Sequence, residues 1–272
     1  MHVIDLRDFY SRPLGAVVRR LVARQVRRLW PNVTGETIVG LGYATPYLTQ
    51  FRDEAAATLA FMPAAQGVVR WPADGASAVA LVDEVSLPLA DASVERVLVV
   101  HGVETVDALK PMLREVWRVL TPGGRLLIVA TNRSGLWARV DSTPFGHGRP
   151  FSKRQLSHLL REGMFSPAGW AQALYMPPLR LALLVRSAIW LERVGAIFWP
   201  GFSGVVLVGA IKEMYAMVPP AQRRFAARLR PELGYLPQDR AGARFTGSNS
   251  NASAETPPAG RGNSPTKGSG QD

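Results

Sequence analysis

Short apolar runs alternate with helical stripes of apolar residues along most of this chain. Between residues 87 and 132, two nearly continuous apolar runs, 96–100 and 125–130, have the pattern of strands that are buried on both faces of a parallel sheet. The stretch between them repeats apolar residues at helical spacing, namely Leu109, Leu113, Val116, Trp117 and Leu120. A Thr-Pro-Gly-Gly sequence then ends that helix. A strand, a helix and a strand in this order predict an α/β fold.

The same patterns extend the sheet on both sides of this unit. Residues 36–41, 57–62 and 78–82 are strand candidates before it, and residues 170–175 and 202–211 are candidates after it. Ser152 is a candidate N-cap for a helix that carries Leu156, Leu159 and Leu160. Glu104 follows the strand at 96–100, and we expect it to begin the next helix, where an acidic residue suits the helix dipole.

Residues 5–30 predict one amphipathic helix with Pro13 in its first turn. Its apolar stripe is Leu14, Val17, Val18, Leu21, Val22, Val26 and Leu29, and its basic face is Arg19, Arg20, Arg24, Arg27 and Arg28. We expect the stripe to pack on the sheet. The basic face is a candidate surface for an anionic partner, such as a membrane surface. Asp5 and Asp8 argue against a mitochondrial presequence.

The central unit resembles a known family. The run LPLADASVERVLVVHGVE, followed by LLREVWRVLTPGGRLLIV, is similar to the fourth and fifth strands of class I S-adenosylmethionine-dependent methyltransferases that act on small molecules. The resemblance extends more loosely over residues 33–213. It implies a Rossmann-like, doubly wound and mostly parallel seven-stranded sheet with helices on both faces and an antiparallel last strand. It also implies an enzyme that transfers a methyl group to a small-molecule acceptor.

The resemblance places the cofactor against the ends of the first four strands. It implies contacts from Gly40, Gly42, Tyr43 and Ala44 after the first strand, Met62 after the second, Asp83 after the third and His101 after the fourth. Family members have an acidic residue in place of Gly40, glycines in place of Ala44 and Pro46, and a ribose-binding carboxylate in place of Met62. These departures predict weakened binding of S-adenosylmethionine. They also support an alternative, a catalytically degenerate protein that acts as a binding or regulatory module.

Two histidines are the candidate catalytic residues. His101 ends a strand at the edge of the sheet where ligands bind in α/β folds, so it could orient a substrate or act as a base. The competing interpretation is a histidine that only packs. His147 lies in the sequence TPFGHGRPF, which is either a loop that covers the substrate or an ordinary connection.

Composition narrows the classes of function. The 272 residues include no Cys and only four His without paired ligand spacing, which disfavours disulfides and a zinc site and suits a cytoplasmic location. The net charge of +11 favours anionic partners, although arginines that merely decorate the surface would give the same value. Because no aromatic and basic signature of an RNA-binding module is present, nucleic acid is not an expected partner.

We predict three segments. Residues 1–30 form the basic helix, residues 31–218 form the methyltransferase-like domain with a helical insertion at 177–200, and residues 219–272 form a basic, disordered tail. Residues 194–211 contain no charge and reach the length of a membrane span. Pro200, Gly201 and Gly204 interrupt this stretch, so we predict a buried strand there and no transmembrane segment.

Overall fold

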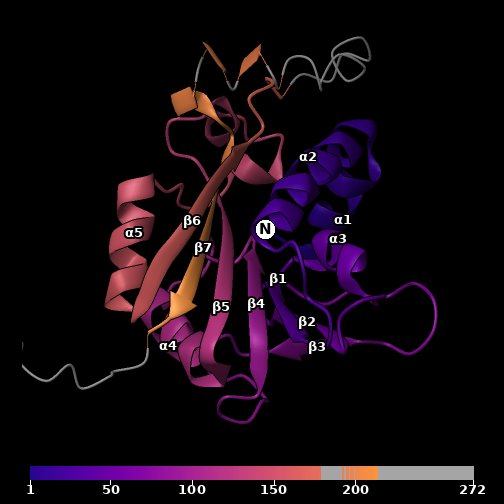
Figure 1. Cartoon of the computed structure of the whole chain (residues 1–272). Coiled ribbons are helices and arrows are strands. Elements are labelled where there is room, and N and C mark those ends of the chain that lie inside the picture. Colours follow the sequence, from indigo (N-terminus) through magenta and orange to yellow (C-terminus); the bar gives the residue numbers. More distant parts are fainter. Residues whose placement is uncertain (179–191, 193, 196, 199, 214–272) are drawn as a thin grey trace, which may run out of the picture. The chain divides into compact units, whose positions relative to one another are not determined.

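A seven-stranded sheet forms the centre of the molecule in the computed structural model (Figure 1). The structure describes residues 1–178, 192, 194–195, 197–198 and 200–213, all of which belong to the unit Met1–Pro219. The strand order is β3-β2-β1-β4-β5-β7-β6. Strands β1 to β5 pair in parallel, and β7 runs antiparallel to both of its neighbours. The predicted fold class, with its antiparallel last strand, is confirmed.

The strands follow the apolar runs of the sequence. They are β1 (Thr37–Gly42), β2 (Ala57–Pro63), β3 (Val79–Val82), β4 (Val94–Val100), β5 (Leu120–Thr131), β6 (Phe165–Ala173) and β7 (Val205–Lys212). Strand β6 begins at Phe165, earlier than the predicted start at residue 170, because it pairs with β7 along most of its length. An edge strand exposes one face, so its first half lacks the continuous apolar run that marks the central strands.

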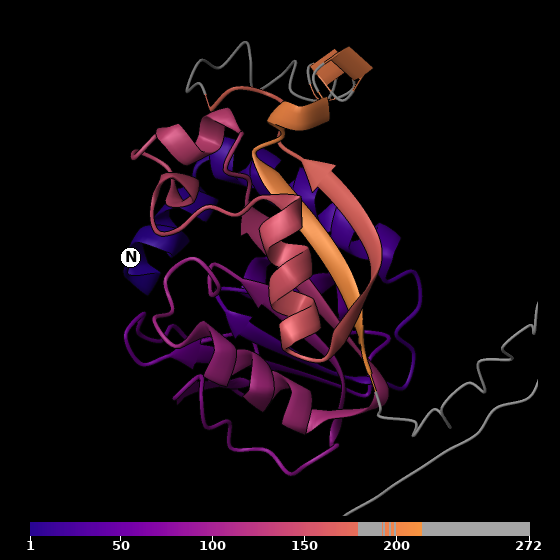
Figure 2. The same cartoon turned by 90° about the vertical axis from the view of Figure 1, so that its left-hand side faces the viewer.

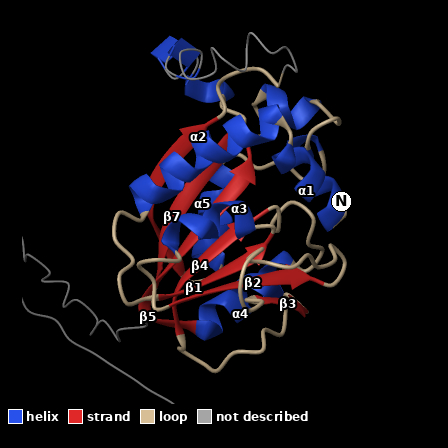
Figure 3. Ribbon diagram, turned by 90° about the vertical axis from the view of Figure 1, so that its right-hand side faces the viewer, coloured by secondary structure: helices blue, strands red, loops and turns tan. Residues whose placement is uncertain are grey.

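Helices cover both faces of the sheet. They are α1 (Val3–Ser11), α2 (Pro13–Leu29), α3 (Thr45–Leu48), α4 (Leu109–Val119) and α5 (Lys153–Glu162), with short 3₁₀ helices η1 (Thr49–Phe51), η2 (Leu136–Arg139), η3 (Pro144–Gly146) and η4 (Pro200–Phe202). Helices α4 and α5 lie in front of one face (Figure 2), and α1, α2 and α3 lie in front of the other (Figure 3).

Alternate residues of the strands feed two separate cores. In β4, Leu98 and Val100 pack with the residues of α1, α2 and α3, whereas Val97 and Val99 pack with those of α4 and α5. The same alternation occurs in β5 and β7. Successive side chains of a strand point to opposite faces, so a strand that is apolar throughout must be covered on both. Each fully buried aliphatic side chain contributes about 1.5–3 kcal/mol.

The N-terminal segment is two helices, so the prediction of one helix over residues 5–30 was wrong. Arg12 is extended, with φ −79° and ψ 159°, and Pro13 is the first residue of α2. Proline disfavours a helical conformation in the residue before it, which breaks the helix there. Gly15 allows the two helices to meet, because a Cβ on it would lie 2.0 Å from the carbonyl oxygen of Phe9. Helix α1 therefore follows a path of its own.

The predicted cap of α5 is confirmed. The hydroxyl of Ser152 accepts a hydrogen bond from the backbone N–H of Gln155 at 3.2 Å, and the Gln155 side chain accepts one from the backbone N–H of Ser152 at 2.9 Å. This reciprocal pair is a capping box, which satisfies two donors at the start of the helix. Leu156, Leu159 and Leu160 then face the core.

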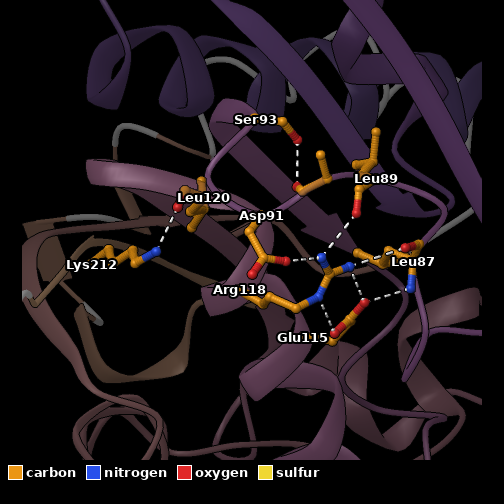
Figure 4. Close-up of polar contacts among 9 residues, drawn as sticks. Leu87, Leu89, Asp91, Ser93, Glu115, Arg118, Leu120 and Lys212 are labelled. Carbon is orange, nitrogen blue, oxygen red and sulfur yellow. Dashed lines mark hydrogen bonds and ion pairs between the residues drawn. The ribbon is translucent and has the colours of Figure 1, made fainter.

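Arg118 ties α4 to the segment that leads into β4 (Figure 4). Its guanidinium donates to the carbonyl oxygens of Leu89 and Leu87, at 2.9 and 3.1 Å, and it forms ion pairs with Glu115 and Asp91. Glu115 in turn accepts a hydrogen bond from the backbone N–H of Leu87 at 2.7 Å. One arginine thereby adds polar contacts to a loop whose Leu87 and Leu89 also pack on the core.

Part of the predicted organisation falls on residues that are not described. The helical insertion predicted at 177–200 lies for the most part outside the described residues, and the tail at 219–272 lies wholly outside them. Within the described part of the chain, no helix has the length and apolar character that a membrane span requires. Most of the uncharged stretch at 194–211 that falls on described residues forms η4 and β7.

Replacement of Arg118 by Gln should lower the free energy of unfolding by about 1–3 kcal/mol, because the loop carbonyls and the Glu115 carboxylate lose a charged donor. Arg114→Gln is the matched control, since Arg114 is an exposed arginine of the same helix. Urea unfolding at neutral pH would measure both variants. Equal stability of the two would show that the Arg118 network adds nothing to the fold.

Candidate functional site

The strand order defines where a ligand would bind. Strands β1 and β4 lie side by side at the centre of the sheet, and the order of strands reverses direction between them. In open α/β sheets, ligands bind at the carboxyl ends of the strands on either side of such a reversal. Tyr43 follows β1 at this place and His101 follows β4, so the structure brings these two predicted residues to one edge.

Aromatic side chains fill this edge. The hydroxyl of Tyr10, from α1, lies 2.9 Å from the hydroxyl of Tyr47 and 2.9 Å from Nε2 of His101. The ring of Tyr10 stacks on Tyr43, with 5.7 Å between centroids, and the ring of Phe145 lies 5.0 Å from the imidazole. All five side chains are buried. We call Tyr10, Tyr43, Tyr47, His101 and Phe145 the switch-point cluster.

The switch-point cluster is electrically neutral around its central hydrogen bonds. Burial lowers the pKa of His101 to about 3 and raises the pKa of Tyr10 well above its usual range. The imidazole is therefore neutral at physiological pH. With a proton on Nδ1, Nε2 accepts a hydrogen bond from Tyr10, whose oxygen in turn accepts one from Tyr47. His101 is therefore packed and hydrogen-bonded within the protein in this arrangement, and its role toward a substrate stays a prediction.

The loop after β1 is shaped by packing within the protein. Gly42 has φ +81°, and a Cβ on it would lie 2.3 Å from the carbonyl oxygen of Val100. The backbone N–H of Tyr43 donates to that same oxygen at 2.8 Å. A Cβ on Gly40 would lie 2.6 Å from the Cβ of Ala44 and 2.7 Å from a methyl carbon of Leu48. The place of the family's acidic residue is therefore closed by apolar side chains.

The end of β2 also lacks a ribose ligand. Met62 is fully buried, and its sulfur accepts a hydrogen bond from the backbone N–H of Val69 at 3.4 Å. Gln66, four residues on, is buried as well, and its Nε2 donates to the carbonyl oxygen of His101 at 3.0 Å. Its backbone carbonyl accepts from the N–H of Val3 at 2.8 Å. Gln66 therefore joins the start of α1 to the end of β4.

Asp83 lies in an exposed turn after β3. Its Oδ1 accepts a hydrogen bond from the backbone N–H of Val85 at 3.0 Å, and its carbonyl oxygen accepts one from Ser86 at 3.1 Å. Both contacts stabilise the turn itself. The role of Asp83 in holding an adenine amino group stays a prediction.

Glu104 is buried between β4 and β5, well before α4 begins at Leu109, so the expectation that it starts this helix was wrong. Its Oε1 accepts a hydrogen bond from the backbone N–H of Thr131 at 2.8 Å, while Oε2 has no partner among the described residues. Burial raises the pKa of the Glu104 carboxyl. The buried backbone N–H of Thr131, at the end of β5, requires a hydrogen-bond acceptor, and the Glu104 carboxylate is oriented toward it.

The loop of His147 closes over these residues through its glycines. Gly148 has φ +81°, and a Cβ on it would lie 2.5 Å from the carbonyl oxygen of Glu104, which accepts a hydrogen bond from the backbone N–H of Arg149 at 2.9 Å. Phe145 of the same loop belongs to the switch-point cluster. His147 itself is exposed and lines a cavity whose lining does not include the buried His101.

Two cavities lie near the N-terminus, and Met1 lines both. The smaller, of about 110 Å³, lies at the carboxyl ends of β1, β2 and β4 and is lined by Leu41, Pro63, Gln66 and Gly102 among others. The Oε1 atom of Gln66 has no hydrogen-bond partner in the described part of the chain. The larger, of about 330 Å³, lies between α1 and the loop around η3, and its lining includes Phe9, Arg12, Asp141 and His147.

Comparisons with known proteins agree with this architecture. Residues 36–128 match the family described as "Methyltransferase domain". A ubiquinone/menaquinone biosynthesis C-methyltransferase of Rubrivivax gelatinosus is 42% identical over 53 residues, a match that covers 20% of this chain and only 21% of that protein.

Solved structures share the fold at low sequence identity. An S-adenosylmethionine-dependent methyltransferase of Thermotoga maritima superposes with a TM-score of 0.55 at 17% identity, over 78% of this chain and 96% of that one. A Haloferax volcanii protein, solved in complex with the Trm112 methyltransferase activator, gives a TM-score of 0.54 at 18% identity, over 79% and 99%. Identities this low establish the fold alone.

The fold and the family match together identify the domain. Residues 36–128 match the methyltransferase domain family, and the seven-stranded sheet that contains them has the fold of the S-adenosylmethionine-dependent methyltransferase with which it superposes. The sequence resemblance carried by the β4–β5 unit is thereby confirmed.

The described arrangement does not fit the whole of S-adenosylmethionine. Pockets for ligands of this size usually measure roughly 300–1,000 Å³, whereas the cavity at the ends of β1, β2 and β4 measures about 110 Å³. Tyr10 lies between the residues that follow β1 and β4, which is the place that a ligand would take. No carboxylate stands at Gly40 or Met62 to compensate.

Tyr10, Tyr47 and Gln66 are site residues that the sequence reasoning missed. A signal for Tyr10 was present, because Val3, Leu6 and Tyr10 share one apolar stripe at helical spacing and all three are buried. Treating residues 5–30 as one helix concealed this stripe. Gln66 offered no signal, since a polar residue in a turn is usually solvated.

The neutral imidazole of His101 should make the protein less stable in acid. Between pH 6.5 and its folded pKa of about 3, the unfolded chain binds a proton on this histidine that the folded protein excludes. Its contribution is therefore lost as the pH falls, by about 2 kcal/mol at pH 5. His101→Asn should flatten the dependence of unfolding free energy on pH in this window, since Asn does not titrate and tolerates the left-handed backbone at φ +50°.

Urea unfolding from pH 4.5 to pH 7 would measure this slope. His147→Asn is the control, because it makes the same substitution at an exposed position outside the switch-point cluster. Glu104 is present in every variant, so its titration cancels in the comparison to first order. An identical slope in wild type and His101→Asn would contradict the burial of a neutral imidazole.

Proposed function

We propose that this protein binds S-adenosylmethionine at the switch-point edge and transfers its methyl group to a small-molecule acceptor, with the described arrangement as a closed state. The observation that carries the proposal is that Tyr10 belongs to α1. The group that fills the ligand position comes from α1, a peripheral helix ahead of the methyltransferase domain, rather than from the sheet. Movement of this short helix would open the edge, and it would withdraw Val3, Leu6 and Phe9 from the core that α1 shares with α2 and α3.

The closed state has a definite energetic consequence. A ligand that binds only the open state has its apparent affinity reduced by the fraction of molecules that are open. Tyr10 contributes two hydrogen bonds and an aromatic stack to the closed state. Bonds of this kind are each worth about 0.5–1.5 kcal/mol. Tyr10 alone would therefore weaken binding by about tenfold or more.

The larger cavity is the proposed site for the acceptor. Its volume of about 330 Å³ suits a small organic molecule. Phe9 lines this cavity, while its neighbour Tyr10 fills the switch point, so displacement of α1 would join the two spaces. His147 and Asp141 are the polar groups that the loop offers to an acceptor there. In this class of enzyme much of the rate enhancement comes from alignment of the two reactants.

A second candidate function rests on a different observation. Gly40 and Met62 stand where carboxylates would hold the cofactor, and apolar packing closes the space around both. A protein that had exchanged cofactor binding for packing would keep the fold as a binding or regulatory module. The same fold serves unrelated functions, so this candidate is compatible with the family match.

Tyr10→Ala should increase affinity for S-adenosylhomocysteine, the demethylated cofactor, by about tenfold or more, because it removes the ring that fills the switch point. Calorimetric titration of the full chain with S-adenosylmethionine and with S-adenosylhomocysteine would measure the change. Tyr10→Phe is the control. It keeps the ring and loses only the two hydrogen bonds, so its gain should be smaller.

The result separates the two candidate functions. Binding by Tyr10→Ala supports the closed state of a methyltransferase, and a search for the acceptor should then use this variant. The methyltransferase proposal would be wrong if wild type and both variants failed to bind at millimolar ligand while melting curves showed folded protein. That result would favour the binding module.

A further inference from the structure

A separate groove lies between the second half of α2 and the edge strand β6. It measures about 490 Å³, which is within the usual range for ligand sites, and its lining includes Arg24, Arg28, Lys153, Trp170, Gln172 and Tyr175. These residues come from α2, from the start of α5 and from β6 with the residues after it. With Glu192, four chain segments contribute to one concave surface.

Three of the lining side chains are cations. Arg24 and Arg28 are four residues apart on α2, so they project from the same side of the helix, one turn apart. Lys153 faces them from the start of α5, and its Nζ donates to Oε1 of Gln172 at 3.0 Å. A concave surface lined by three charges of one sign attracts a ligand of the opposite sign.

Arg24 and Arg28 differ from neighbouring arginines, which are paired with glutamates. Arg27, on the same helix, is paired with Glu54 and stacks on Phe51 with 4.5 Å to the ring centroid. Arg96 is likewise paired with Glu36. Within the residues that the structure describes, Arg24 and Arg28 form no salt bridge. Their guanidinium groups remain available for a ligand.

Glu192 is the acidic residue of the groove, and its carboxylate is already committed. Its oxygens accept hydrogen bonds from the backbone N–H groups of Leu174 and Tyr175, both at 2.7 Å. Burial raises the pKa of this carboxyl, although the backbone donors and the charge of Arg24 oppose the rise. The groove therefore keeps a net positive charge.

We infer that the groove between α2 and β6 is a binding site for a phosphate-bearing ligand. Arginine recognises phosphate oxygens with a planar fork of donors, and lysine adds a point charge. Trp170 and Tyr175 supply aromatic walls beside these cations. A free phosphate compound and the headgroup of an anionic lipid offer the same chemistry to these side chains. The inference is independent of whether S-adenosylmethionine binds at the switch point.

Two probes distinguish the sources of phosphate, and both use the full chain. Calorimetric titration with inorganic pyrophosphate tests a soluble ligand. Co-sedimentation with phosphatidylcholine vesicles that contain phosphatidylglycerol, compared with vesicles of phosphatidylcholine alone, tests a lipid headgroup. Binding of either probe by the wild-type protein is the expected result, and the probe that binds identifies the source.

The double variant Arg24→Gln/Arg28→Gln should weaken binding of that probe at least tenfold, because two charged donors are lost. The matched control is Arg154→Gln/Arg161→Gln, which removes the same charge from exposed positions of α5 outside the groove and should change binding less than twofold. Melting curves would establish that both variants fold. Equal weakening in the two variants would mean attraction by net charge alone, and that result or the absence of binding to either probe would overturn the inference.

Discussion

The close approach of β1 and β4 is the constraint on which the rest of the structure depends. Gly42 turns the chain with φ +81° directly against the carbonyl oxygen of Val100, which then accepts a hydrogen bond from the N–H of Tyr43. A side chain at residue 42 would drive the two strands apart. This contact lies where the order of strands reverses, and ligands in open α/β sheets bind at the carboxyl ends of the strands beside such a reversal.

The residues around that edge have been adapted to packing. Where class I methyltransferases place an acidic side chain and further glycines, this chain has Gly40, Ala44 and Pro46, and the first two fit against Leu48. Met62 takes the place of the ribose ligand and turns inward. Tyr10 then completes the surface from α1 with hydrogen bonds to His101 and Tyr47. In the described state, the neutral imidazole of His101 and the phenols of Tyr43 and Tyr47 contact the buried Tyr10 of α1 in place of a ligand.

The sheet and its cofactor loop were predictable to different degrees. The central strands could be read from the sequence because each is apolar on both faces, and this pattern survives any rearrangement of the loops. The start of β6 could not, since one face of that edge strand is exposed and its pattern depends on β7. Pro13 was the only sequence signal for the break at Arg12. A proline in the first turn of a helix does not reveal whether another helix ends just before it.

The sequence by itself determined the order of the strands, the family of the domain and the positions at which the cofactor motif is altered. These follow from local periodicity and motif spacing, which are properties of consecutive residues. Only the tertiary structure decided what fills the altered site. Tyr10, Gln66, Glu104 and Phe145 come from distant parts of the chain, and nothing in the local sequence of any of them specifies the other three. Their contacts arise because the sheet brings the ends of β1, β4 and β5 together beneath α1, where each buried polar group must find a partner.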